Sequence, residues 1–256
     1  MSIRSFRFVA ALAAAMVATS VAAAAEIKVL SAGAYRQVLG AMAPDFEKRT
    51  GHKLVIDRGT VGQLVKRIED GEAFDFVIVT PAAIGKLTQT GKVAAGTLTP
   101  VASVGVGVMV KEGAPRPDVS TVDAFKKTLL AAKTVAYIDP ASGGSSGIYT
   151  SKLLKSLGIA DTIKPKERLK KGGHVADLVV SGKAEIGIQQ ISEIVPVKGV
   201  TFVGPLPKEI QNITVYAAGI AAKSRNPDAV KALLTTLTGP AADQVLKSKG
   251  MEKPGG

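Results

Sequence analysis

The chain has 256 residues, of which 46% are hydrophobic and 21% are charged, and it contains no cysteine. This composition excludes an intrinsically disordered chain, and the lack of cysteine excludes disulfide scaffolds, cysteine-ligated zinc and iron–sulfur clusters. The formal net charge is +12, but the basic residues are spread along the chain and aromatic residues make up only 4%, so we expect a small anionic ligand rather than a nucleic acid.

The first 25 residues have the pattern of a secretory signal peptide. Arg4 and Arg7 form a basic start, an alanine-rich apolar run follows over 8–17, and three alanines end at Ala25. The apolar run is shorter than the ~20 residues that a membrane span needs, so a cleaved signal is favoured over an anchor. We therefore expect an exported protein whose mature chain begins at Glu26, and the absence of a following cysteine excludes a lipid anchor.

Strand and helix patterns alternate over the next part of the chain. We predict strands over 26–31, 53–57 and 74–79, with helices over 34–49 and 61–71 between them. The second helix is defined by apolar residues at helical spacing, namely Val61, Leu64, Val65 and Ile68. A long extended run rich in valine and glycine follows over 101–110.

The second half of the chain repeats this alternation. Strands are predicted over 134–138 and 184–189, helices over 147–157 and 175–180, and another extended run over 214–222, before two C-terminal helices. The basic segment 164–171 is interpreted as a solvated loop. Repeated strand–helix–strand units favour an α/β fold with mainly parallel sheets.

Three strand-to-helix turns consist of small residues and could present backbone amides to an anion. They lie at 31–35, 58–62 and 139–147. Glycine and serine also form ordinary turns, so one such turn would mean little, whereas three in one α/β chain favour a ligand site. None of these turns matches a nucleotide-binding motif or a nucleophile elbow.

The sequence offers little material for catalysis. Ser145 or Ser146 could act as a nucleophile only beside a base, and His174 is the plausible candidate for that base. Asp75 and Asp139 are interpreted as structural carboxylates. We therefore expect no catalytic residue, no metal site and no cofactor.

Four blocks of the chain carry more specific patterns, at 29–79, 139–165, 183–190 and 230–251. They include L-x-x-x-I-E-x-G from Leu64, D-P followed by G-I-Y from Asp139, and G-P-A-A from Gly239. With these blocks the chain resembles the periplasmic molybdate-binding protein family, the solute receptors of ABC importers with a type II periplasmic binding fold. The resemblance implies two lobes around a ligand cleft, lobe one comprising 26–104 plus 215–256 and lobe two 105–214.

The resemblance also implies which positions bind the ligand. In the family, a serine in each of the first two turns, backbone amides of the third turn and of a later helix, and a tyrosine hold a tetrahedral oxyanion. Those positions are Ala34, Val61, Ser146, Val175 and Gln190 here, so the three side-chain hydroxyls are missing. A hydrogen bond to a charged group contributes about 1.5–3 kcal/mol, so we expect molybdate to bind weakly and another anion to be preferred.

Neighbouring donors could replace the missing hydroxyls, and Arg58 could bind an organic carboxylate. The ligand-binding residues that we expect are Gly33, Ala34, Tyr35, Arg58, Gly59, Thr60, Val61, Ser142, Ser145, Ser146, Val175, Gln189 and Gln190.

The sequence thus predicts a monomeric periplasmic solute-binding protein of an ABC importer. It would close on a small anion, either a molybdate-like oxyanion or an organic carboxylate, and deliver it to a permease in the inner membrane. Two alternatives stay open: a ligand-binding partner of a membrane sensor, and an exported serine hydrolase built around Ser146.

Overall fold

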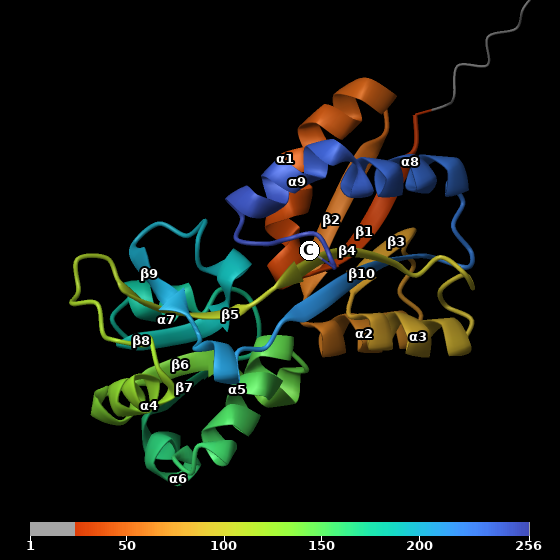
Figure 1. Cartoon of the computed structure of the whole chain (residues 1–256). Coiled ribbons are helices and arrows are strands. Elements are labelled where there is room, and N and C mark those ends of the chain that lie inside the picture. The colour runs from red at the N-terminus through yellow and green to blue at the C-terminus, as the bar shows by residue number, and fades with distance from the viewer. Residues whose placement is uncertain (1–23, 256) are drawn as a thin grey trace, which may run out of the picture.

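A computed structural model describes residues 24–255 of the chain, which form two lobes, each built around a five-stranded sheet (Figure 1). The predicted signal peptide falls, apart from its last two residues, outside the described part of the chain. No helix in the described part is long and apolar enough to cross a bilayer.

The first lobe contains a sheet with the strand order β2-β1-β3-β10-β4. Its strands are β1 (Glu26–Ala32), β2 (Lys53–Gly59), β3 (Phe76–Val79), β4 (Thr99–Val104) and β10 (Thr214–Ile220). One face packs against α1 (Gly33–Thr50), α8 (Pro227–Thr238) and α9 (Pro240–Ser248), and the other against α2 (Val61–Glu69) and α3 (Pro81–Gln89).

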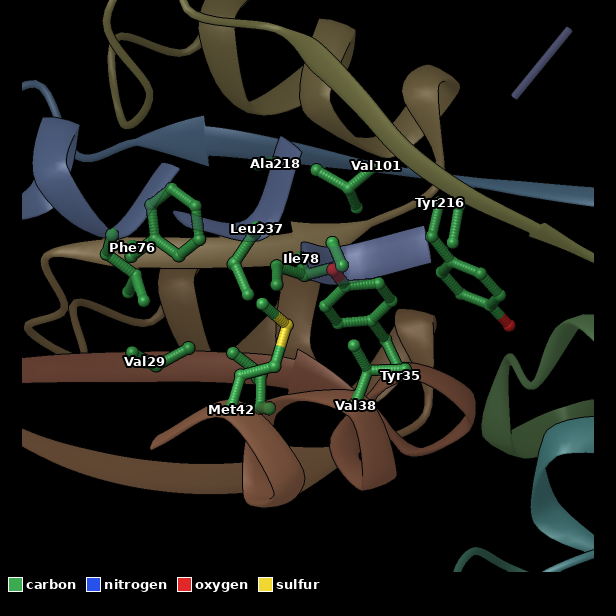
Figure 2. Packing of buried hydrophobic residues seen from close by; sticks show 14 of the residues in the cluster. Val29, Tyr35, Val38, Met42, Phe76, Ile78, Val101, Tyr216, Ala218 and Leu237 are labelled. Carbon is green, nitrogen blue, oxygen red and sulfur yellow. The ribbon is translucent and has the colours of Figure 1, made fainter. Parts of the chain in front are cut away.

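Strand alternation places a separate apolar cluster on each face of this sheet. Phe76 and Ile78 of β3 pack with α1 and α8, while Val77 and Val79 of the same strand pack with α2 and α3. Figure 2 shows the first of these clusters, in which the ring of Tyr35 lies among aliphatic side chains. Because β3 is buried on both faces, its sequence is a continuous run of apolar residues.

The second lobe contains a sheet with the order β7-β6-β8-β5-β9. Its strands are β5 (Val106–Lys111), β6 (Val135–Ile138), β7 (Glu167–Lys170), β8 (Ile186–Gln190) and β9 (Val200–Pro205). Helices α4 (Val122–Ala131), α5 (Ser145–Ser156) and α6 (Ala160–Ile163) cover one face, and α7 (Ala176–Val180) covers the other. Short 3-10 turns include η1 (Pro140–Ser142), η2 (Lys164–Lys166), η3 (Ile191–Glu193) and η4 (Lys208–Ile210).

Both sheets are mixed rather than mainly parallel. In the first sheet β1 pairs in parallel with β2 and β3, whereas β10 is antiparallel to both β3 and β4. The second sheet repeats this arrangement, with β6 parallel to β7 and β8, and β5 antiparallel to β8 and β9. The antiparallel pairs arise because β10 and β5 each enter their sheet directly after a crossing from the other lobe.

The two extended runs predicted from the sequence have different roles. The run 101–110 is two strands, β4 and β5, which belong to different sheets and meet at Gly105. The second run lies within the first sheet as β10, so the chain returns through 206–213. The basic segment 164–171 is not a loop throughout, because Glu167–Lys170 pair with β6 as the edge strand β7.

Candidate ligand-binding site

A cavity of about 290 Å³ lies between the lobes, where the strands β1, β2 and β6 end. The first lobe lines it with Ala32, Gly33, Ala34, Arg58, Gly59, Thr60, Val61, Gln63 and Tyr216. The second lobe lines it with Ile138, Gly144, Ser145, Ser146, Lys170, Gly172, Gly173, Asp177, Gln190 and Glu193.

Two helices, one from each lobe, begin at this cavity without a side-chain cap. Helix α1 follows Ala32 and helix α5 follows Gly144, and neither of these N-cap residues provides a side-chain acceptor. The first amides of such a helix have no partner within the helix, and its dipole favours negative charge. The cavity therefore offers an anion backbone donors from both lobes.

A close approach brings the start of α5 to the end of β6. A Cβ atom at Gly147 would lie 2.1 Å from the carbonyl oxygen of Ile138, so this position accepts only glycine. The glycine-rich turn is thus needed for packing, and that packing places the amides of Ser145 and Ser146 at the cavity.

Helix α2 also begins at the cavity, but its donors hold the lobes together. The Thr60 side chain accepts from the Gln63 amide at 3.2 Å and donates to the carbonyl of Ser142 in the other lobe. The Gly62 amide donates to the Gly143 carbonyl at 3.1 Å, and the Gln63 side chain donates to the Lys171 carbonyl at 2.8 Å. We call these three interlobe bonds the latch.

The charged groups at the cavity differ in exposure and pairing. The Arg58 side chain is exposed and makes no ion pair within residues 24–255, whereas Lys170 pairs with Asp177 at 2.7 Å. Glu193 is only 8% exposed and has no ion-pair partner among the described residues. Burial raises the pKa of its carboxyl to about 8, although the Gln189 amide and Arg58 oppose this shift.

His174 does not complete a nucleophilic pair. Its ring Nδ1 lies 3.3 Å from the backbone carbonyl oxygen of Glu193, and burial lowers its pKa. Among the described residues no hydrogen bond joins His174 to Ser145 or Ser146. The arrangement that the hydrolase alternative needs is therefore not formed. The described residues also contain no cluster of three or more side chains suited to holding a metal.

The structure brings most of the expected ligand-binding residues to the cavity. Those that line it are Gly33, Ala34, Arg58, Gly59, Thr60, Val61, Ser145, Ser146 and Gln190. The Thr60 hydroxyl, expected to bind ligand, is instead engaged by the Ser142 carbonyl.

Four expected residues do not line the cavity, and each has another structural role. Tyr35 is buried in the apolar core of the first lobe, and Ser142 contributes its carbonyl to the latch. The Val175 amide donates to the side chain of Gln189 at 2.7 Å, so it is not free for a ligand. Gln189 also donates to the Gly173 carbonyl at 2.9 Å and thereby holds this loop in place.

Several lining residues were not predicted from the sequence. Lys170 lay in the segment interpreted as a solvated loop, and Tyr216 lay in an extended run with no polar pattern. Figure 2 shows the Tyr216 hydroxyl pointing out of the apolar cluster, on the side of the green second-lobe ribbon. Glu193 is the last residue of η3, which follows directly after β8, and a polar residue just beyond a buried strand was the available signal.

The sequence profile of the bacterial extracellular solute-binding proteins matches residues 27–252. The chain belongs to this family. Its two lobes have the fold of periplasmic binding proteins, as the solved structures show. The periplasmic molybdate-binding protein of Azotobacter vinelandii superposes with a TM-score of 0.73 at 21% identity, covering 89% of this chain and 99% of that one. The sulfate-binding protein SubI of Mycobacterium tuberculosis gives 0.71 at 17% identity, covering 90% and 88%.

Two curated relatives of this solute-binding protein carry different names. A protein of a Pseudomonas species named aconitate isomerase is 34% identical over 232 residues, covering 88% of this chain and 87% of that one. The molybdate-binding protein ModA of Azotobacter vinelandii is 29% identical over 257 residues, covering 98% of each. The chain is thus a divergent member of the molybdate-binding-like solute-binding proteins.

Proposed function

We propose that the protein is a periplasmic receptor that closes on an organic di- or tricarboxylate and delivers it to an ABC permease of the inner membrane. The observation that carries the proposal is the convergence of two uncapped helix N-termini, one from each lobe, on the cavity beside Arg58. Such a site binds carboxylates through backbone amides and requires both lobes to be close together.

Three features favour a carboxylate over molybdate. Ala34 and Val61 offer no side-chain hydroxyl at the cavity, and Val61 with Ile138 gives apolar surface suited to a carbon skeleton. The cavity volume of about 290 Å³ is close to the lower limit of small-molecule pockets. This volume exceeds what a bare tetrahedral ion fills. The name of the Pseudomonas relative points in the same direction, because aconitate is an unsaturated tricarboxylate.

We further propose lobes divided as 26–104 plus 215–256 and 105–214, moving as rigid bodies about the two crossings near Gly105 and 206–213. The mature monomer would act in the periplasm after cleavage near Ala25. Presentation of the loaded protein to a membrane sensor is the alternative role. Loss of carboxylate uptake in a strain that lacks the gene supports transport, whereas unchanged uptake with a lost transcriptional response supports sensing.

Calorimetric titration of the mature chain tests the ligand class. We expect micromolar binding of at least one of citrate, malate and trans-aconitate, and weak or absent binding of molybdate, tungstate and sulfate. Submicromolar molybdate binding together with no carboxylate binding would contradict the proposal and support the plain molybdate-receptor assignment.

A further inference from the structure

Glu193 is a feature of the cleft that binding alone does not explain. It is a buried carboxyl with no ion-pair partner in the described structure, and it lines the cavity that the helix N-termini prepare for an anion. An ionised carboxylate there would oppose an anionic ligand.

The carboxyl group lies beside Gly33, the first residue of α1. A Cβ atom at Gly33 would lie 2.6 Å from Glu193 Oε1, so glycine is required for the two elements to approach this closely. Arg58 on β2 and Tyr216 on β10 face the same cavity. Burial and the nearby Glu193 raise the pKa of Tyr216, so its phenol stays protonated. The Nδ1 atom of His174 lies 3.3 Å from the backbone carbonyl oxygen of Glu193.

This combination is suited to proton abstraction next to a carboxylate. Helix N-termini and Arg58 would stabilise the negative charge that develops on a substrate carboxylate when a neighbouring C–H bond breaks. A buried glutamate within the same cavity would provide the base. Because the base and the charge-stabilising donors lie on the walls of one cleft, a bound ligand of suitable size can contact both.

We propose that Glu193 is a catalytic acid–base residue that moves a proton between two carbon atoms of an unsaturated polycarboxylate bound in this cleft. The proposal rests on the carboxylate binding proposed above. It adds an activity to that binding. It also identifies the ligand as a molecule with a C–H bond next to a carbon–carbon double bond, and with a carboxylate attached to the same carbon or conjugated to it through that double bond.

The step balances without a co-reactant. Glu193 in its carboxylate form takes a proton from the CH₂ group next to the double bond. The electron pair of that C–H bond forms a new double bond, and the pair of the old double bond delocalises into the conjugated carboxylate. Glu193, now protonated, returns the proton to the carbon at the other end of the three-carbon unit. The double bond has moved, and nothing is oxidised or reduced.

The electrostatic surroundings of Glu193 support this role. Burial raises the pKa of its carboxyl to about 8, which makes its conjugate base stronger than an ordinary glutamate. The groups that face it are Arg58 from β2, Tyr216 from β10 and the Gln189 amide from β8. The His174 ring lies beside the backbone carbonyl of Glu193, and burial lowers the pKa of that ring. Since the base must be ionised, kcat/KM should rise with pH up to about 8.

Proton NMR in D₂O with trans-aconitate as the probe tests the proposal. We expect the wild-type mature chain to exchange the CH₂ protons for deuterium and to form cis-aconitate. Glu193→Gln should lower both rates by at least about a hundredfold, while calorimetry finds its affinity for trans-aconitate within about tenfold of wild type. The glutamine is nearly isosteric, and thermal unfolding of the variant checks that it folds.

Glu209→Gln is the matched control, because Glu209 lies on η4 of the same lobe, is exposed and does not line the cavity. Prepared from the same host, it should exchange at the wild-type rate, and the contrast with the slow Glu193→Gln preparation excludes a contaminating enzyme. Exchange by Glu193→Gln at the wild-type rate overturns the proposal. So does tight binding of trans-aconitate by wild type without exchange, which leaves the receptor function standing. Failure of every carboxylate to bind would overturn both.

Discussion

Arg58 carries the exposed positive charge at the cleft that no acidic partner neutralises within residues 24–255. We expect Arg58→Gln to weaken carboxylate binding by about tenfold, near the low end for a charge-assisted bond because the side chain is exposed. Calorimetry at two salt concentrations should also show a smaller salt dependence than wild type. Arg168→Gln on β7 makes the same change of charge away from the cavity and should bind as wild type. Equal weakening by both variants would show that only the net charge matters.

Glu193 should also leave a signature in the pH dependence of stability. Its folded-state pKa of about 8 lies above the ordinary 4.5. Between pH 4.5 and pH 8 the folded protein therefore holds a proton on Glu193 that the unfolded chain has lost. The contribution of Glu193 to stability is therefore fully present below about pH 4.5 and is lost as the pH rises through about 8. Thermal unfolding should show that the melting temperature of Glu193→Gln rises relative to that of wild type as the pH increases from 5 to 9. A constant difference across this range would contradict the raised pKa.

At the scale of elements, the start of α2 and the turn after η1 fit together through two glycines. A Cβ atom at Gly62 would lie 2.8 Å from the Cα atom of Gly143, which is backbone and cannot rotate away. We expect Gly62→Ala to disfavour the closed form and to weaken ligand binding although no cavity-lining group is changed. Titration calorimetry measures the loss. Gly40→Ala in α1, where an added Cβ meets nothing within 4 Å, is the control and should bind normally.

The elements were largely predictable because their signals are local. The uncapped starts of α1 and α5 could be predicted from small-residue turns after strands, and the apolar stripe of α2 from its spacing. Non-local pairing was harder to predict. Glu167–Lys170 include three charged side chains, a pattern typical of a loop. Their backbone nevertheless pairs with β6 at a sheet edge, where charged residues are tolerated.

The part of the site that escaped prediction depends on contacts between distant segments. The Val175 amide is occupied by a side chain fourteen residues away, and Glu193 reaches Gly33 only because η3 packs on α1. Tyr35 is adjacent to the expected turn in sequence, but the helix turns its side chain into the core. The spacing of residues along the chain does not indicate in which direction these side chains and amides point.

For the whole molecule, the separate cores and the two crossings predict a change of shape on binding. We expect small-angle scattering of the mature chain to give a smaller radius of gyration with saturating carboxylate than without it, since ligand contacts from both lobes favour closure. Gly62→Ala should show less compaction at the same saturation. A radius that ligand leaves unchanged would indicate a protein that is already closed when free.

The latch has a consequence for how the protein gives up its ligand. Its acceptors are the backbone carbonyls of Ser142, Gly143 and Lys171, and its donors are a hydroxyl, an amide and a carboxamide, so none of these six groups titrates. A fall in pH or a rise in salt concentration should therefore leave the latch almost as strong as before. We therefore expect ligand release to require opening of the latch itself, and not a change of pH or salt.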